Sequence, residues 1–71
     1  MGDPAIGCVD INTATATELQ AIIHIGPVLA QRILQLRRTR RFQSVNELTR
    51  VNGIAAARLR DILAEGLACV R

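Results

Sequence analysis

Apolar residues recur at intervals of three and four along two stretches of the chain, with polar residues between them. This spacing puts apolar side chains on one face of an α-helix, so it predicts short amphipathic helices that pack around a core. Each stretch is expected to hold a shorter helix followed by a longer one. The residues that define the apolar faces are Leu19, Ile22, Ile23, Ala30, Ile33 and Leu34 in the first stretch and Leu48, Val51, Leu59, Ile62 and Leu63 in the second.

The two stretches are copies of one another in register. Shifting the sequence by 29 residues aligns residues 15–34 with residues 44–63 without a gap. Hydroxyl, carboxylate, aliphatic and turn positions all recur, which shared Ala and Leu content alone would not produce. The identical pairs are Glu18 with Glu47, Leu19 with Leu48, Ile25 with Ile54, Ile33 with Ile62 and Leu34 with Leu63. Each copy is therefore predicted to be one helix–turn–helix unit.

Capping residues mark the ends of the predicted helices. Thr15-x-x-Glu18 and Ser44-x-x-Glu47 have the capping-box pattern, in which two side chains satisfy backbone N–H groups at a helix start. Each is expected to begin an α-helix of about two turns. Gly66 is expected to close the last helix in a left-handed conformation.

Neither unit can bury its apolar face alone, so the two are expected to pack against each other. The predicted fold is all-α: two repeats form a compact, pseudo-symmetric four-helix unit of the SAM-like type. It should occupy residues 9–71, after an extended N-terminal segment at residues 1–8. Phe42, the one aromatic residue, lies in the link between the repeats and is expected to fill the seam between them.

Length and charge narrow the class of protein. With 71 residues, 49% of them apolar, the chain should fold as one domain close to the lower size limit for a self-sufficient core. The net charge is +3, and all nine basic residues are arginines, five of them between Arg32 and Arg41. This favours an anionic partner, although an ordinary basic surface is the alternative. No apolar run approaches the roughly 20 residues of a membrane span.

The predicted turns carry the most specific signal. Residues 22–28 (IIHIGPV, the first hairpin) and 51–57 (VNGIAAA, the second hairpin) resemble the helix-hairpin-helix turn, aliphatic-x-Gly-aliphatic-Gly. The preceding residues 9–14 (VDINTA) resemble the lead-in of the ComEA-type competence DNA-binding domains. The resemblance covers residues 9–67, and similar domains occur as appendages on bacterial secreted nucleases. It implies a duplex bound across the minor groove, with contacts to both strands.

The physical basis of such binding is simple. A glycine-rich turn allows close approach to the backbone, and the N–H groups of the helix that starts there attract a phosphate. Backbone amides carry no base information, so the binding should be independent of sequence. The resemblance assigns phosphate contacts to Gly26, Val28 and Leu29 in the first hairpin and to Gly53, Ala55, Ala57 and Arg58 in the second. The arginine candidates are Arg32, on the exposed face of the longer helix of the first repeat, and Arg37 and Arg38, for which a solvated helix end is the alternative.

Each hairpin departs from the family pattern at one position. His24 stands where the first glycine belongs, and Ala55 stands where the second belongs. If the first position needs a positive φ, His tolerates it better than most residues, and Gly53 is ideal there. Ala55 lies near a helix start, where Ala costs little. The second hairpin is therefore expected to be the better phosphate site, and a first hairpin kept only for packing is the alternative.

Other groups add two expectations. The resemblance implies a monovalent cation, K⁺ or Na⁺, held by turn carbonyls in some hairpins, and Thr49, Val51 and Ile54 have the matching positions; no other cofactor is expected. Cys8 and Cys69 could form a disulfide between adjacent chain ends, or they could be two unrelated thiols. The location stays open, with an extracytoplasmic one favoured over the cytoplasm.

The function expected from all this is sequence-independent binding of double-stranded DNA by an accessory module in DNA uptake or DNA processing. No catalytic constellation is recognisable, so the chain is not expected to be an enzyme, and any nuclease activity would belong to a neighbouring domain of a larger parent protein. Single strands and RNA are less favoured because exposed aromatic residues are lacking. The alternative is a protein-interaction module whose degenerate hairpins do not bind DNA.

Overall fold

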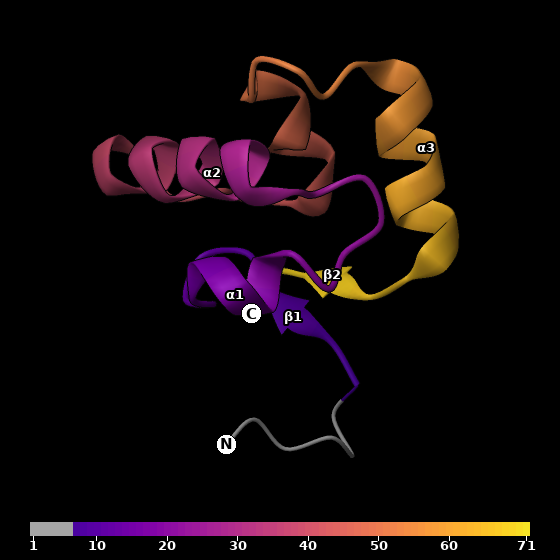
Figure 1. The fold of residues 1–71 in the computed structure, drawn as a ribbon, viewed down its shortest axis with the longest axis horizontal. Helices are drawn as coiled ribbons and strands as arrows, with labels where there is room; N and C mark the ends of the chain where they lie inside the picture. Colours follow the sequence, from indigo (N-terminus) through magenta and orange to yellow (C-terminus); the bar gives the residue numbers. More distant parts are fainter. Residues whose placement is uncertain (1–6) are drawn as a thin grey trace.

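The computed structural model describes residues 7–71, which are mostly helical (Figure 1). Residues 1–6 of the expected N-terminal segment lie outside the described residues. In chain order, the elements are β1 (Val9–Asp10), α1 (Ala16–Leu19), α2 (Pro27–Thr39), the 3-10 helix η1 (Val45–Arg50), α3 (Ala56–Glu65) and β2 (Ala68–Cys69). The four expected helices are therefore all present.

The fold is mostly helical, as predicted, but the two ends of the domain add a short strand pair that was not predicted. Strands β1 and β2 pair in parallel, with Val9 opposite Ala68 and Asp10 opposite Cys69. The backbone N–H of Ile11 donates to the carbonyl of Cys69 at 3.0 Å and extends the pairing. Two-residue strands are too short to show the alternation by which a strand is recognised in a sequence.

A disulfide joins Cys8 to Cys69 directly beside this strand pair, and their Cα atoms are 5.8 Å apart. Of the two interpretations left open by the sequence, the structure contains the bridge. It closes a loop over a sequence separation of 61 residues. The two ends of the domain are thus held together both by backbone hydrogen bonds and by a covalent bond.

The capping box at Thr15 and Glu18 is confirmed. The Glu18 N–H donates to Thr15 Oγ1 at 3.1 Å, and the Thr15 N–H donates to Glu18 Oε1 at 2.9 Å. Helix α1 is nevertheless only four residues long, so the expected length of about two turns is wrong.

The equivalent helix of the second repeat does not form a capping box. Ser44 makes no side-chain cap, and the element is a 3-10 helix rather than an α-helix. Glu47 Oε1 instead accepts from the N–H of Gln43 at 3.0 Å and from Arg50 Nη1 at 3.2 Å. The Glu47 carboxylate therefore accepts hydrogen bonds from Gln43 and Arg50 instead of from the N–H of Ser44.

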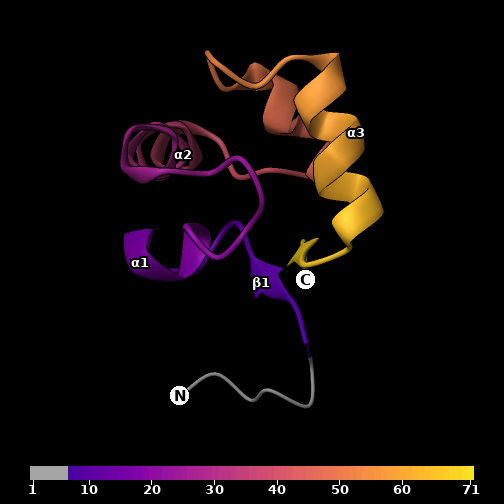
Figure 2. The same ribbon diagram turned by 45° about the vertical axis from the view of Figure 1, so that its right-hand side comes forward.

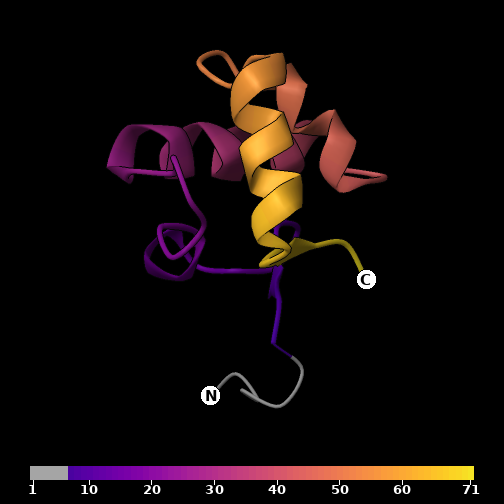
Figure 3. The same cartoon turned by 90° about the vertical axis from the view of Figure 1, so that its right-hand side faces the viewer.

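The longer helices stand across one another. In Figure 1, α2 lies horizontally, and α3 stands upright near the N-terminal end of α2. Helix α1 packs against α2, whereas α3 packs against η1 and β2. The turned views show the second hairpin at the top of the molecule and the paired chain ends below it (Figures 2 and 3). Gly66 ends α3 at φ 75°, as expected.

The core joins both repeats, and Phe42 is completely buried in it, as predicted. The Phe42 N–H donates to Asn12 Oδ1 at 2.7 Å, and Asn12 Nδ2 donates to the Phe42 carbonyl at 2.9 Å. Leu63 does not belong to the core, because 45% of it is exposed. The core side chains are Ile11, Ala14, Leu19, Ile22, Ile25, Leu29, Ala30, Ile33, Phe42, Leu48, Val51, Ile54 and Ile62.

Within residues 7–71, no helix has the length and apolar character that crossing a membrane requires.

Reduction of the Cys8–Cys69 disulfide should lower the free energy of unfolding by about 4 kcal/mol, since the bridge restricts the unfolded chain over a long loop. Urea unfolding followed by circular dichroism, with and without reductant, measures this loss. The variant with both Cys8→Ser and Cys69→Ser is the control, because reductant should not change its midpoint. Equal midpoints for oxidised and reduced wild-type protein would contradict the expectation.

Candidate nucleic-acid interface

The two hairpin turns have the same hydrogen-bonded backbone, 29 residues apart. In the first, the Ile25 N–H donates to the Ile22 carbonyl at 3.1 Å. In the second, the Ile54 N–H donates to the Val51 carbonyl at 3.0 Å. The two aliphatic residues that close each turn are buried and anchor it to the core: Ile22 and Ile25 in the first, Val51 and Ile54 in the second.

The tip of each turn has a left-handed residue at the first glycine position of the family pattern. Gly53 has a φ of 109°, and His24 has a φ of 69°, the one positive value at a non-glycine residue in the described part of the chain. The expectation that this position needs a positive φ is therefore confirmed. Gly53 adopts it without strain, whereas His24 bears the cost of a side chain in the left-handed region.

The second glycine position needs no glycine. Gly26 precedes α2 with φ −97° and ψ −170°, and Ala55 precedes α3 with nearly the same values, −98° and −177°. These are extended conformations that any residue adopts, so Ala55 costs little, as expected. Each residue then accepts the first hydrogen bond of its helix, from Ala30 in α2 and from Leu59 in α3.

The two helix starts differ in the amides that they offer. The first turn of α3 presents the N–H groups of Ala56, Ala57 and Arg58, all exposed residues, and within residues 7–71 no acceptor is paired with them. In α2 the first position is Pro27, which has no N–H, and Leu29 is buried. The second hairpin therefore offers a fuller and more open set of donors for an anion.

Carboxylates of α3 face the first hairpin. Glu65 Oε1 accepts from the backbone N–H of Ile23 at 2.9 Å, and Asp61 Oδ2 lies 2.8 Å from His24 Nε2. This hairpin thus already has acidic partners within the protein, which oppose the approach of a phosphate. Both carboxylates belong to the second repeat, and no spacing in the sequence indicates that they meet the first hairpin.

An arginine faces the second hairpin instead. Arg32 Nη1 donates to the backbone carbonyl of Asn52 at 2.6 Å, so Arg32 is half-buried beside the turn. A Cβ at Gly53 would lie 2.8 Å from Leu29 Cδ2 and 3.3 Å from Arg32 Nη1. Glycine is therefore favoured here both by its φ and by the close contact with the Leu29 and Arg32 side chains of α2.

The remaining arginine candidates lie apart from one another. Arg58 is exposed at the start of α3, among the free amides. Arg37 and Arg38 lie in the last turn of α2, about 15 Å along its axis from the first hairpin. Arg37 Nη1 donates to the carbonyl of Ile11 at 3.1 Å, so it ties α2 to the lead-in, whereas Arg38 is exposed. The structure does not bring either of them to a hairpin turn.

No group of three or more His, Cys, Asp or Glu side chains that could hold a metal ion occurs among residues 7–71.

The comparison with known proteins identifies the family. Residues 5–64 match the family model described as the helix-hairpin-helix motif, so the chain belongs to the helix-hairpin-helix family. It is 39% identical over 70 residues to a protein of Thioalkalivibrio sp. (strain K90mix) named deoxyribonuclease. It is 47% identical over 47 residues to ComE operon protein 1 of Bacillus subtilis (strain 168). The ComEA-like resemblance is thereby confirmed.

The chain corresponds to only a part of these relatives. The match to the deoxyribonuclease covers 99% of this chain and 19% of the relative, and the match to ComE operon protein 1 covers 65% and 23%. The chain thus spans about a fifth of the length of the curated relatives that it matches. No solved structure matches it significantly.

Gly53→Ala should destabilise the fold more than Gly66→Ala does. Both glycines have a positive φ, but an added Cβ at Gly66 meets nothing within 4 Å, whereas at Gly53 it meets the buried Leu29 side chain. Gly66→Ala should cost about 1 kcal/mol from the φ alone, and Gly53→Ala about 1–3 kcal/mol more from overpacking. Urea unfolding of the three proteins tests this. Equal losses would show that Leu29 yields without cost.

Proposed function

We propose that the chain binds duplex DNA through backbone phosphates, without reading its sequence, as a non-catalytic accessory module in DNA uptake or DNA processing. The observation that carries this is the start of α3, where Gly53 turns the chain and exposed N–H groups follow at Ala56, Ala57 and Arg58. Such a row of donors at the positive end of a helix suits a phosphate. The guanidinium of Arg58 adds a positive charge at the same place.

The phosphate contacts are unequal in this proposal. The second hairpin is the principal grip, with the amides of Gly53, Ala55, Ala57 and Arg58. The first hairpin, with Gly26, Val28 and Leu29, is a weaker one, because Pro27 removes a donor and the carboxylates of α3 lie beside the turn. Arg38 adds long-range attraction from the far end of α2.

We also propose that the repeats are related by a pseudo-twofold axis in a SAM-like arrangement, so that they meet phosphates on both strands of the duplex. Two reciprocal contacts support this. Arg32 of α2 reaches Asn52 in the second hairpin, and Asp61 of α3, which is equivalent to Arg32 in the 29-residue register, reaches His24 in the first. The matching turn conformations also fit such an axis.

The relatives support an accessory role. The match to the deoxyribonuclease covers 19% of that protein, which leaves most of its length to carry the catalytic part. The Cys8–Cys69 disulfide favours an extracytoplasmic location, because disulfides persist in oxidising compartments. A larger parent protein, such as one with a nuclease domain, is the expected setting.

A monovalent cation at the second hairpin is compatible with the carbonyl oxygens of the turn. The residues that would hold K⁺ or Na⁺ are Thr49, Val51 and Ile54, through their carbonyl oxygens, which are the hard ligands that such cations prefer. The Val51 carbonyl accepts one hydrogen bond, from the Ile54 N–H, and keeps a second lone pair. A cation there would add positive charge beside the phosphate.

A carboxylate placed at the start of α3 should abolish most DNA binding without harming the fold. Ala57→Glu puts a negative charge where the phosphate is proposed to bind, while the helix dipole favours that charge. Val28→Glu is the equivalent change in the first hairpin and should weaken binding less. Ala64→Glu, near the C-terminal end of α3, is the control for charge and should change the affinity least.

Fluorescence anisotropy with a random duplex of about 20 base pairs, at several salt concentrations, measures these affinities. Wild-type binding should weaken steeply as salt rises, because phosphate contacts release counterions. Equal effects of Ala57→Glu and Ala64→Glu would contradict the assignment of the site. No binding by the wild-type protein even at low salt would favour a protein-interaction module instead.

A further inference from the structure

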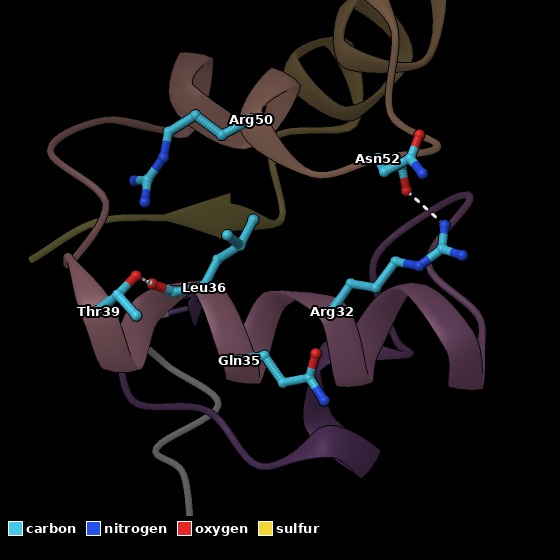
Figure 4. A pocket seen from close by; sticks show the side chains of 6 residues that line it. All are labelled: Arg32, Gln35, Leu36, Thr39, Arg50 and Asn52. Atoms are coloured by element: carbon cyan, nitrogen blue, oxygen red, sulfur yellow. Dashed lines mark hydrogen bonds between the residues drawn. The ribbon is translucent and has the colours of Figure 1, made fainter.

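A groove lies between α2 and the second hairpin, on the side away from the first hairpin. Its volume is about 430 Å³, which is in the range of small-ligand sites. Figure 4 shows Arg32 reaching toward Asn52 at one end and Arg50 extending across from Thr39 at the other. The residues that line this arginine groove are Arg32, Gln35, Leu36, Thr39, Arg50 and Asn52.

Both arginines of the groove are held in place by the protein. Arg32 Nη1 donates to the Asn52 carbonyl. Arg50 donates through Nη1 to Glu47 and through Nη2 to the carbonyl of Arg40, and its guanidinium lies 4.6 Å from the centre of the Phe42 ring. A guanidinium has five N–H donors, so each keeps donors for a ligand. Arginines that are fixed but not saturated lose little conformational freedom when they bind a phosphate.

The charge of the groove is positive. No carboxylate is among its lining residues. Glu47 lies behind Arg50, and the pKa of its carboxyl is lowered, first by the hydrogen bond from the Gln43 N–H and then by Arg50, so it stays ionised at neutral pH. It offsets one of the two lining arginines and leaves the charge of the other uncompensated. The first hairpin, by contrast, faces Asp61 and Glu65.

We propose that the arginine groove seats a phosphate of the same DNA strand that the second hairpin grips, and that the strand continues from the hairpin along α2 rather than toward the first hairpin. This inference rests on the proposed function. The groove begins at Asn52, which belongs to the hairpin turn itself, so the two phosphate positions adjoin. Because α2 and η1 form its walls, the groove would hold the backbone of the strand and leave the bases outside.

Two variants test the groove directly by anisotropy with random duplex DNA. Thr39→Glu brings a carboxylate beside the proposed phosphate and should weaken binding about fivefold or more. Arg32→Gln should lower the slope of log affinity against log salt by about one unit, since one phosphate contact is lost. Arg60→Gln, which removes an exposed charge on α3, is the matched control and should leave the slope unchanged. Circular dichroism checks that each variant is folded.

Photocrosslinking gives a second measurement that does not depend on affinity. Benzoylphenylalanine at Thr39 should crosslink to labelled duplex DNA, whereas the same group at Gln20, an exposed residue at the end of α1, should not. Strong crosslinking from Gln20 and none from Thr39 would overturn the proposal.

The outcomes separate this proposal from the function on which it rests. Loss of binding in Ala57→Glu, with Thr39→Glu and Arg32→Gln indistinguishable from Arg60→Gln, would overturn the groove and keep the hairpin site. No DNA binding by the wild-type protein would overturn both. If the protein binds no DNA but binds a polyglutamate peptide in an Arg32-dependent manner, the groove is a site for an acidic protein segment.

Discussion

The burial of Phe42 holds the two repeats together. The N–H and the carbonyl of Phe42 both form hydrogen bonds with the Asn12 side chain. The Phe42 ring is completely buried, and Arg50 lies over it. These contacts join three separate parts of the chain: the lead-in, the link between the repeats and η1. A small aliphatic core gains much from one large buried ring, and a cation over its face adds a further attraction. The position of Arg50, and with it the shape of the arginine groove, follows from where Phe42 lies.

The two hairpins show that one backbone can have two chemical roles. A helix start attracts any anion that can reach its free N–H groups. Beside the first hairpin, the protein supplies anions itself through Asp61 and Glu65, and the turn is bound to α3. Beside the second, it supplies Arg32, and the amides of α3 stay open to solvent. The charge of the facing helix, together with the missing N–H of Pro27, therefore separates a weaker candidate phosphate site from a stronger one.

Local features could be predicted from the sequence because they depend on neighbouring residues. The 29-residue repeat located both turns, and the glycine pattern indicated the left-handed conformation at His24 and Gly53. Contacts between repeats could not be predicted in this way. Arg32 was expected on an exposed helix face, but it donates a hydrogen bond to the carbonyl of Asn52. Arg37 was expected to contact a phosphate, but it donates a hydrogen bond to the carbonyl of Ile11. Such partners depend on how α2 and α3 cross, and no spacing within either repeat contains that information.

The same limit explains the errors at the ends of elements. Ser44 and Glu47 have the sequence of a capping box, yet η1 is a 3-10 helix and the Glu47 carboxylate accepts hydrogen bonds from Gln43 and Arg50 instead. The short strands at Val9 and Ala68 exist only because the two ends of the domain meet.

The closure of the domain at Cys8 and Cys69 has a mechanical consequence. A force that pulls on the two ends of the domain would load the disulfide and the strand pair beside it, and little of it would reach the helices. The second hairpin lies at the opposite side of the molecule (Figures 1 and 3). A module built in this way could carry tension between its two ends while the shape of its hairpin turns stays the same.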